Sequence, residues 1–433
     1  MVLWRSYILS FSIISGKFYE KSFKFPHKAT IKNNFGRLGE NLSFFRRIPH
    51  IDAKKGWVFM TKPNEKKALL DKAVFGGLQI VAFKNMDRLV ADGIVEVSSS
   101  PTKYVTARGQ EFTRLRIQDD LIDKMVAGSK WIKGKKVDYC NLAVTIINDE
   151  VGNLVCYTVD QYKAYLDQIK EYLMDQYGIL VAMDGATLKE IEINRTFRLK
   201  DDFKDYHRAI NLLMVTLPPR WKKQMLYREI NNQVVDYQTY YATTNKTQNS
   251  KRYAQFKIYD KTRQLKHIVK LKDYYMRVEF RLIGTEMVKK SLGTNRLAEL
   301  TDERINEYFD RQIEKMIVQP YKKWKAARDK AVVDLMIEQR KKDIRHWQTN
   351  VLHLLADKEI DHYWSMILSM GELLPLVNKL GLNSKRTSDI KQNFMKQAQK
   401  YQRRFCTDDD KKLSEIIEKM TAREAFGEEK KIA

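Results

Sequence analysis

Strict alternation of apolar and polar residues marks three segments of this 433-residue chain, at 189–194, 252–261 and 275–282. Successive side chains of a β-strand point to opposite faces, so each segment is predicted to be a strand with one apolar and one polar face. Such a chain must contain a sheet that packs on one side only. The apolar members are Ile191 and Ile193, then Ala254, Phe256 and Ile258, then Met276, Val278, Phe280 and Leu282.

The polar faces hold the residue types that phosphodiester chemistry uses, provided that the three strands share one sheet. A tyrosine phenol such as that of Tyr259 can attack a phosphodiester, and a lysine such as Lys261 can stabilise the developing charge. The carboxylates Glu192 and Glu279 can hold a divalent metal. Each residue taken singly also fits an ordinary strand: a half-buried tyrosine, a solvated lysine and a surface ion pair of Glu279 with its neighbouring arginines.

The order of elements over residues 137–300 reads as β-β-α-β-α-β-β-β. Apolar residues recur at helical spacing between residues 162 and 173 and again between 203 and 214, where Pro218 and Pro219 end the second helix. This order predicts an α+β fold with a largely antiparallel sheet and helices on one face.

The chain divides by pattern into four parts. Residues 1–56 are basic and irregular, and residues 57–130 contain helical patterns at 67–74 and 85–91, then two short apolar pieces at 94–97 and 104–106. That second part resembles a winged helix-turn-helix DNA-binding domain, but it equally fits a helix beside an unrelated hairpin. Residues 131–300 form the α+β part. Residues 301–433 are helical, with one stripe interrupted at Pro320.

Charge favours a nucleic acid as partner. The chain has 79 Lys and Arg against 54 Asp and Glu, a formal net charge of +25 that is spread along its length. A polyanion is the natural partner of such a chain. The three cysteines show no metal-ligand spacing, which fits a reducing cytoplasm and predicts neither a zinc site nor a disulfide framework. The apolar run at 7–15 is too short to span a bilayer, so no membrane is expected.

Two neighbouring motifs resemble those of a rolling-circle initiator family. They are Phe256–Lys261 (FKIYDK) and Met276–Arg281 (MRVEFR), and Lys189–Arg195, Val137–Tyr139 and Tyr206–Arg208 look like further family segments. The family includes replication initiators of small Gram-positive plasmids, relaxases of some conjugative transposons and, more distantly, gene II-type proteins of filamentous phages. The resemblance covers residues 137–300 and leaves both ends of the chain uncovered.

The resemblance implies site-specific nicking and rejoining of DNA at a single-stranded or hairpin origin, dependent on Mg²⁺ or Mn²⁺. Tyr259 would be the nucleophile that keeps the 5′ phosphate and leaves a 3′-hydroxyl primer, with Lys261 beside it. Tyr240 and Tyr241 are competing nucleophiles on a nearby strand. The implied metal ligands are Glu192, Glu279 and Asp138, and the implied DNA contacts are Arg252, Lys257, Arg263, Arg277 and Arg281.

Asp138 falls in register with the apolar residues of its own strand, so it needs a bulge or a strand end to reach a metal. Two other functions remain open: a non-catalytic, sequence-specific DNA-binding initiator or repressor, and a conjugative relaxase with the same chemistry. A host helicase and a second copy of the chain are the further partners considered.

Overall fold

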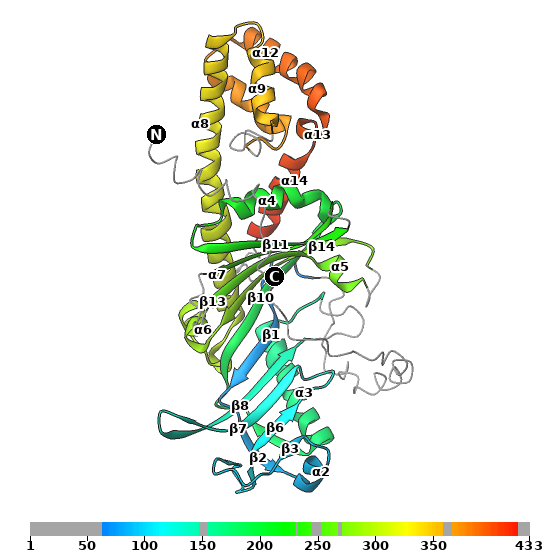
Figure 1. Cartoon of the computed structure of the whole chain (residues 1–433), viewed down its shortest axis with the longest axis vertical. Helices are drawn as coiled ribbons and strands as arrows, with labels where there is room; N and C mark the ends of the chain where they lie inside the picture. The colour runs from blue at the N-terminus through cyan, green and yellow to red at the C-terminus, as the bar shows by residue number, and fades with distance from the viewer. Residues whose placement is uncertain are drawn as a thin grey trace, which may run out of the picture.

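A ten-stranded antiparallel sheet forms the centre of the computed structural model, in the order β11-β12-β13-β14-β10-β1-β8-β7-β6-β3 (Figure 1). The structure describes residues 63–146, 154–230, 233–244, 253–266, 271–357 and 366–422, and not the side chains of residues 224–238. The strands of the large sheet are β1 (Leu69–Gly76), β3 (Val95–Glu96), β6 (Arg114–Ile117), β7 (Lys124–Ile132), β8 (Lys135–Thr145), β10 (Thr187–Leu199), β11 (Trp221–Ile230), β12 (Gln233–Thr244), β13 (Tyr253–Asp260) and β14 (Tyr274–Ile283). Two small sheets pair β2 (Gln79–Phe83) with β9 (Ile179–Ala182), and β4 (Tyr104–Val105) with β5 (Glu111–Phe112).

The three alternating segments are neighbours in this sheet, because β14 lies between β10 and β13. Glu192 stands opposite Arg281, and Lys257 stands opposite Glu279, so their side chains share one face. Ile193 and Phe256 both stand opposite Phe280 and share the other face. The predicted α+β class, with a large antiparallel sheet, is confirmed.

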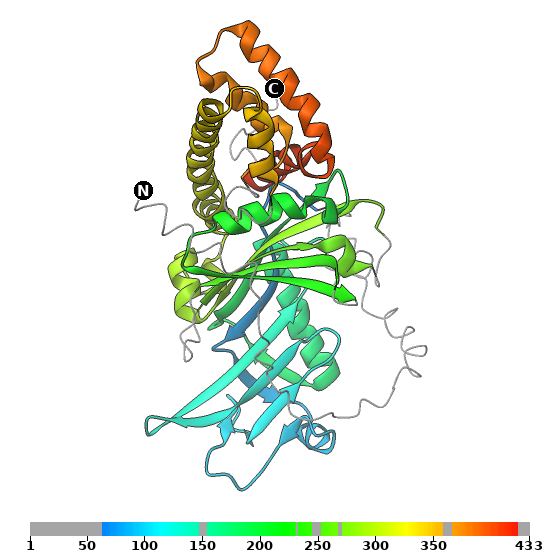
Figure 2. The same cartoon turned by 45° about the horizontal axis from the view of Figure 1, so that its top comes forward.

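Helices cover the apolar face of the sheet (Figure 2). Phe280 packs edge-on against Phe309 with ring centroids 5.4 Å apart, and Phe75 meets Tyr162 at 6.3 Å. These contacts and one shared core cluster place four helices over the buried side chains of the strands. The helices are α3 (Val159–Tyr177), α4 (His207–Thr216), α7 (Asp302–Ile313) and α14 (Asp409–Thr421).

A charged side chain ties this helical layer to the sheet. Arg195 of β10 lies on the apolar face and is only 1% exposed. Its guanidinium donates to Asp310 of α7 at 3.0 Å and to the carbonyl of Ala422, just after α14, at 2.8 Å. It also stacks over the Phe309 ring, 4.5 Å from the centroid. A buried cation with these partners fixes how α7 and α14 sit on the sheet.

The C-terminal helices build a second core. The long helix α8 (Gln319–Lys342) leaves the sheet, and its far half packs with the other helices around Met336, Val351 and Phe394. The chain then returns, because Leu413 and Ile416 of α14 join the core beneath the sheet. The remaining helices are α9 (Trp347–Ala356), α11 (Met370–Val377), α12 (Ser384–Ala398) and α13 (Gln402–Phe405).

The predicted interruption at Pro320 takes a different form. Residues 314–318 make a π-helical turn, and α8 follows directly with Pro320 in its first turn. A proline lacks the N–H of an ordinary helical residue and crowds the carbonyl four residues earlier. The wider π turn relieves that conflict, so the helix continues instead of ending.

Residues 63–130 do not form a separate winged helix. The expected helix at 67–74 is the central strand β1, which lies between β10 and β8 and has every residue buried except the half-buried Lys72 and Val74. Such a strand shows no alternation, so its apolar run cannot be told from a helix by periodicity. The expected hairpin is absent as well: β3 pairs with β6, and β4 pairs with β5. Of this region only the short helix α2 (Met86–Ala91), capped by Asn85, is as expected.

Two further short α-helices are α5 (Lys261–Leu265) and α6 (Thr285–Leu292). No helix within the described ranges is both long and apolar enough to cross a membrane.

Replacing Arg195 with Leu is expected to lower the free energy of unfolding by about 3 kcal/mol, because the change leaves Asp310 without its buried cation. Arg198→Leu on the same strand is the matched control, since that arginine pairs with Asp273 while its side chain is 58% exposed. Its removal should cost less than about 1 kcal/mol. Chemical unfolding of both variants measures the difference. Equal losses of unfolding free energy in the two variants would contradict the role of Arg195 in holding the helices on the sheet.

Candidate functional site

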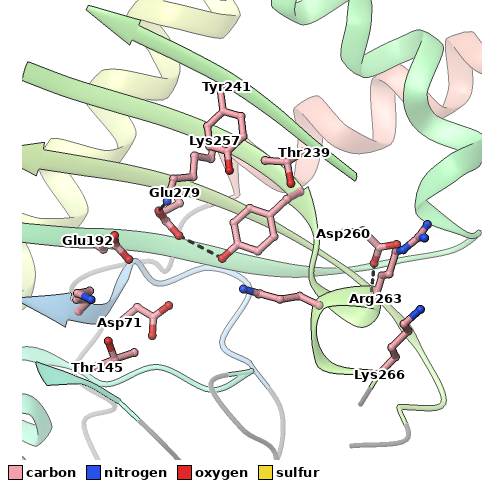
Figure 3. A pocket seen from close by; sticks show the side chains of 13 residues that line it. Asp71, Thr145, Glu192, Thr239, Tyr241, Lys257, Asp260, Arg263, Lys266 and Glu279 are labelled. Carbon is pink, nitrogen blue, oxygen red and sulfur yellow. Dashed lines mark hydrogen bonds and ion pairs between the residues drawn. The ribbon is translucent and has the colours of Figure 1, made fainter. Parts of the chain in front are cut away.

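A cavity of about 580 Å³ opens on the polar face of the sheet, between β1, β10, β12, β13 and β14 and the start of α5 (Figure 3). Four of the residues singled out from the sequence line it together: Glu192, Lys257, Tyr259 and Glu279. They come from three different strands, and the register of the sheet brings them to one place. Asp71 of β1 lines the cavity as well.

Three carboxylates point toward one another at the base of this cavity (Figure 3). One oxygen each of Asp71, Glu192 and Glu279 lies within 4.8 Å of the others. None of the three residues is more than 9% exposed. Asp71 reaches the group through a β-bulge, since the register of β1 against β10 shifts between Leu70 and Lys72. A bulge re-aims a side chain, here out of an otherwise apolar strand.

Three cations surround these carboxylates. Arg277 is wholly buried and donates to Asp71 at 2.8 Å, to Thr196 at 2.8 Å and to the carbonyl of Leu154 at 3.0 Å. Lys257 forms an ion pair with Glu279. Arg281 lies 3.2 Å from Glu192 and also donates to Glu190. The cluster therefore consists of oppositely charged side chains that are largely buried from solvent.

The carboxyl charges are still not fully compensated. Burial raises the pKa of Glu192 to about 7, and the neighbouring Glu279 adds to the rise. Burial alone would lower the pKa of Lys257, but Glu279 and Glu192 outweigh it and raise that pKa. A divalent cation favours this kind of position, where several carboxylate oxygens converge. Asp71, Glu192 and Glu279 thus fit the metal that the sequence resemblance implies.

Tyr259 stands beside the carboxylates. Its hydroxyl donates a hydrogen bond to Glu279 at 3.1 Å, and the residue is 8% exposed. Burial and then the Glu279 charge raise the pKa of this phenol well above its usual value. The phenol is therefore protonated near neutral pH and has a carboxylate positioned to accept its proton.

Lys261 follows two residues later at the start of α5, where Asp260 caps the helix. Its ammonium lies 5.8 Å from the centroid of the Tyr259 ring and donates to Gln264 at 2.8 Å. Burial and then the charge of Arg277 lower the pKa of Lys261 to about 7. A lysine with that pKa can both give and take a proton near neutral pH.

The sheet separates the two competing tyrosines. Tyr240 stands opposite Ile258 on the apolar face, is 1% exposed and packs against Phe203. Tyr241 stands opposite Lys257 on the polar face and lines the cavity. Only Tyr241 therefore shares the cavity with Tyr259.

Other candidates from the sequence lie elsewhere. Asp138 sits near the tip of the β7–β8 hairpin, where it accepts a hydrogen bond from Ser129 and pairs with Lys136. It remains in register with the apolar side of β8 and takes no part in the carboxylate cluster. Arg263 lines the cavity, whereas Arg277 is buried beneath it. Arg252 lies outside the described residues.

Asp71 is the cluster member that sequence reasoning missed. A lone acid inside the apolar run Leu69–Phe75 is the signal that could have drawn attention to it. A buried carboxylate in such a run needs a partner, and that partner, Arg277, is more than two hundred residues away in the sequence.

We predict that Arg277→Leu lowers the free energy of unfolding by about 3–5 kcal/mol, because Asp71 would remain buried beside Glu192 and Glu279 without its cation. Adding Asp71→Asn to this variant should restore part of the loss, since the uncompensated charge is then removed. Thermal and chemical unfolding of the single and double variants measure the coupling. A double variant that is less stable than Arg277→Leu alone would contradict this account of the cluster.

No family model matches the chain, and no curated protein matches it. One solved structure found by shape is a rolling circle replication initiator protein from Geobacillus stearothermophilus, with 12% identity and a TM-score of 0.27 over 58% of this chain and 85% of that one. Another is the di-domain ARO/CYC protein BexL from the BE-7585A biosynthetic pathway, with 11% identity and a TM-score of 0.16 over 56% and 92%. At these TM-scores neither likeness assigns a fold or a function to this chain.

Proposed function

We propose that this protein is a rolling-circle replication initiator that nicks one DNA strand through Tyr259 and later rejoins it. One observation carries the proposal: a tyrosine and three converging carboxylates from four separate strands meet at one cavity on the polar face, and the ammonium of the buried Lys261 lies 5.8 Å from the centroid of the tyrosine ring. The net charge of +25 supports a nucleic acid as the substrate. The motifs around Tyr259 and Glu279 resemble those of rolling-circle initiators, which supports this chemistry over others.

In the proposed reaction the Tyr259 oxygen attacks the phosphorus of one phosphodiester. The bond from tyrosine to phosphorus forms while the bond from phosphorus to the 3′ oxygen breaks, so the 5′ phosphate stays on the protein. Glu279 takes the phenol proton along the hydrogen bond of 3.1 Å. The departing 3′ oxygen receives a proton from Lys261, whose lowered pKa of about 7 suits that role. Rejoining is the reverse attack by a 3′-hydroxyl.

Asp71, Glu192 and Glu279 would hold the divalent cation, Mg²⁺ or Mn²⁺. When bound, such a cation polarises the scissile phosphate and offsets its charge. Arg263 and Lys266 border the cavity and are suited to orient the phosphate backbone. Arg277 and Arg281 act by holding the carboxylates in position, because both are engaged with them.

A conjugative relaxase would use the same site. It differs from a replication initiator only in the process that the nick starts, which is conjugative transfer instead of replication. The non-catalytic alternative, an origin-binding protein or repressor, would share the charge but give the tyrosine and the carboxylates no chemical task. The formation of a covalent adduct distinguishes the catalytic functions from this one.

Wild-type protein incubated with Mn²⁺ and single-stranded oligonucleotides tiled from its own replicon should form a covalent protein–DNA adduct on denaturing gels. EDTA should abolish the adduct, and Tyr259→Phe should abolish it by removing the nucleophile. Tyr240→Phe is the matched control and should retain it, because that tyrosine faces the core.

Two other outcomes would change the conclusion. An adduct that survives Tyr259→Phe but is lost in Tyr241→Phe would keep the reaction and move the nucleophile along the same face. Absence of any adduct from wild-type protein that still binds duplex DNA would favour the non-catalytic alternative.

A further inference from the structure

The β7–β8 hairpin extends from the body of the protein far beyond the core (Figure 2). Its turn is formed by Lys133 and Gly134, which both have positive φ. Near the turn the hairpin exposes large apolar side chains, with Trp131 61% exposed and Ile132 43% exposed. An extended arm with exposed aromatic and aliphatic groups at its tip is typical of a surface that contacts a partner.

Lysines dominate the tip. Four of the eight residues 130–137 are lysines, namely Lys130, Lys133, Lys135 and Lys136. Within the described part of the chain, only Lys136 of these four forms an ion pair, with Asp138. Among the described residues the lysines of this arm therefore meet little negative charge, and the partner that complements them is an anion.

The arm continues the same face of the sheet that carries the candidate site. Thr145, at one end of β8, stands opposite Lys72, and both line the cavity. Side chains at every second residue along β8 share that face, which leads to Lys135 at the other end. Lys130 of β7 belongs to the same face, since it stands opposite Val137.

A second hollow lies on this route. It encloses about 260 Å³, and its lining includes Lys130, Tyr139 and Lys189. Lys189 donates to Asn141 at 2.5 Å, and Lys130 lies 5.4 Å from the centroid of the Tyr139 ring. Burial lowers the pKa of Lys189, and the charge of Lys130 in the same hollow, whose lining also includes Asp138, lowers it further. An anionic group bound there would relieve their repulsion.

We propose that the β7–β8 hairpin is a DNA-binding arm that holds the phosphate backbone of the DNA extending from the candidate site along the polar face. The inference rests on the proposed function for the identity of the polyanion. Thr145 and Lys135 are separated by roughly 33 Å, at about 3.3 Å per residue of strand. That span equals about one turn of duplex DNA, so the arm would contact DNA about ten base pairs from the cut.

The test measures DNA binding by the full chain as a function of salt. Fluorescently labelled duplex and single-stranded oligonucleotides would be titrated with wild-type protein and with Lys130→Gln/Lys135→Gln. The matched control is Lys330→Gln/Lys341→Gln, which removes the same charge from exposed positions on α8. The hairpin variant should bind about tenfold more weakly, and its slope of log K against log salt should fall by about 2 for duplex DNA. The control should match wild type.

The length of the DNA distinguishes a contact made by the arm from a general effect of the lost positive charge. On DNA extending only about 6 base pairs from the cut, the hairpin variant and wild type should bind alike, because the DNA ends before the arm. If wild type and the hairpin variant bind long duplex DNA equally well, and also bind long single-stranded DNA equally well, the proposal is overturned. A loss seen only with single strands, or only with duplex, would keep the arm and identify which form it holds.

The adduct assay separates this inference from the proposed function. At saturating DNA the hairpin variant should form as much adduct as wild type, whereas Tyr259→Phe should bind DNA with unchanged salt dependence and form none. If wild type forms no adduct but the hairpin variant loses affinity for DNA, the DNA-binding role of the arm is supported and the nicking reaction is contradicted.

Discussion

Carboxylates held close together in a space with little water must be matched by cations, and this requirement organises the polar face of the sheet. Asp71, Glu192 and Glu279 converge to within 4.8 Å, and Arg277, Arg281 and Lys257 each engage one of them. Because these six side chains come from β1, β10, β13 and β14, the charge balance also fixes the register of the strands. The hydroxyl of Tyr259 is anchored to the same cluster through Glu279.

Much of this face could be predicted from the sequence, because period-2 alternation assigns each residue of a half-buried strand to one face. That rule placed Glu192, Lys257, Tyr259 and Glu279 together without any structure. It failed for Asp71, which reaches the polar face through a bulge that alternation does not encode. For Asp138 the same rule predicts a side chain on the face opposite the polar one. The structure agrees and places this residue near the hairpin tip.

Strands can be predicted from the sequence where apolar and polar residues alternate, and cannot where that alternation is missing. β13 and β14 alternate between apolar and polar residues in the sequence, although residues 275–280 of β14 are all buried, whereas β1 shows no alternation and its apolar run fits a helix equally well. Strand partners were equally hidden: β3 pairs with β6 across an intervening hairpin of β4 and β5, and no local turn signal specifies that pairing. The return of α14 to the sheet depends on Arg195, a residue that looks polar and exposed in the sequence.

Calorimetric titration of Mn²⁺ into the full chain measures whether the three carboxylates form one divalent metal site beside Tyr259. We expect a single bound ion per chain, with affinity reduced at least about tenfold by Glu279→Gln, which replaces a charged carboxylate ligand with a neutral amide. Glu190→Gln, a change on the same face outside the cluster, should leave the affinity unchanged. A wild-type chain that binds no Mn²⁺, or a Glu279→Gln chain that binds it as tightly as wild type, would contradict the account.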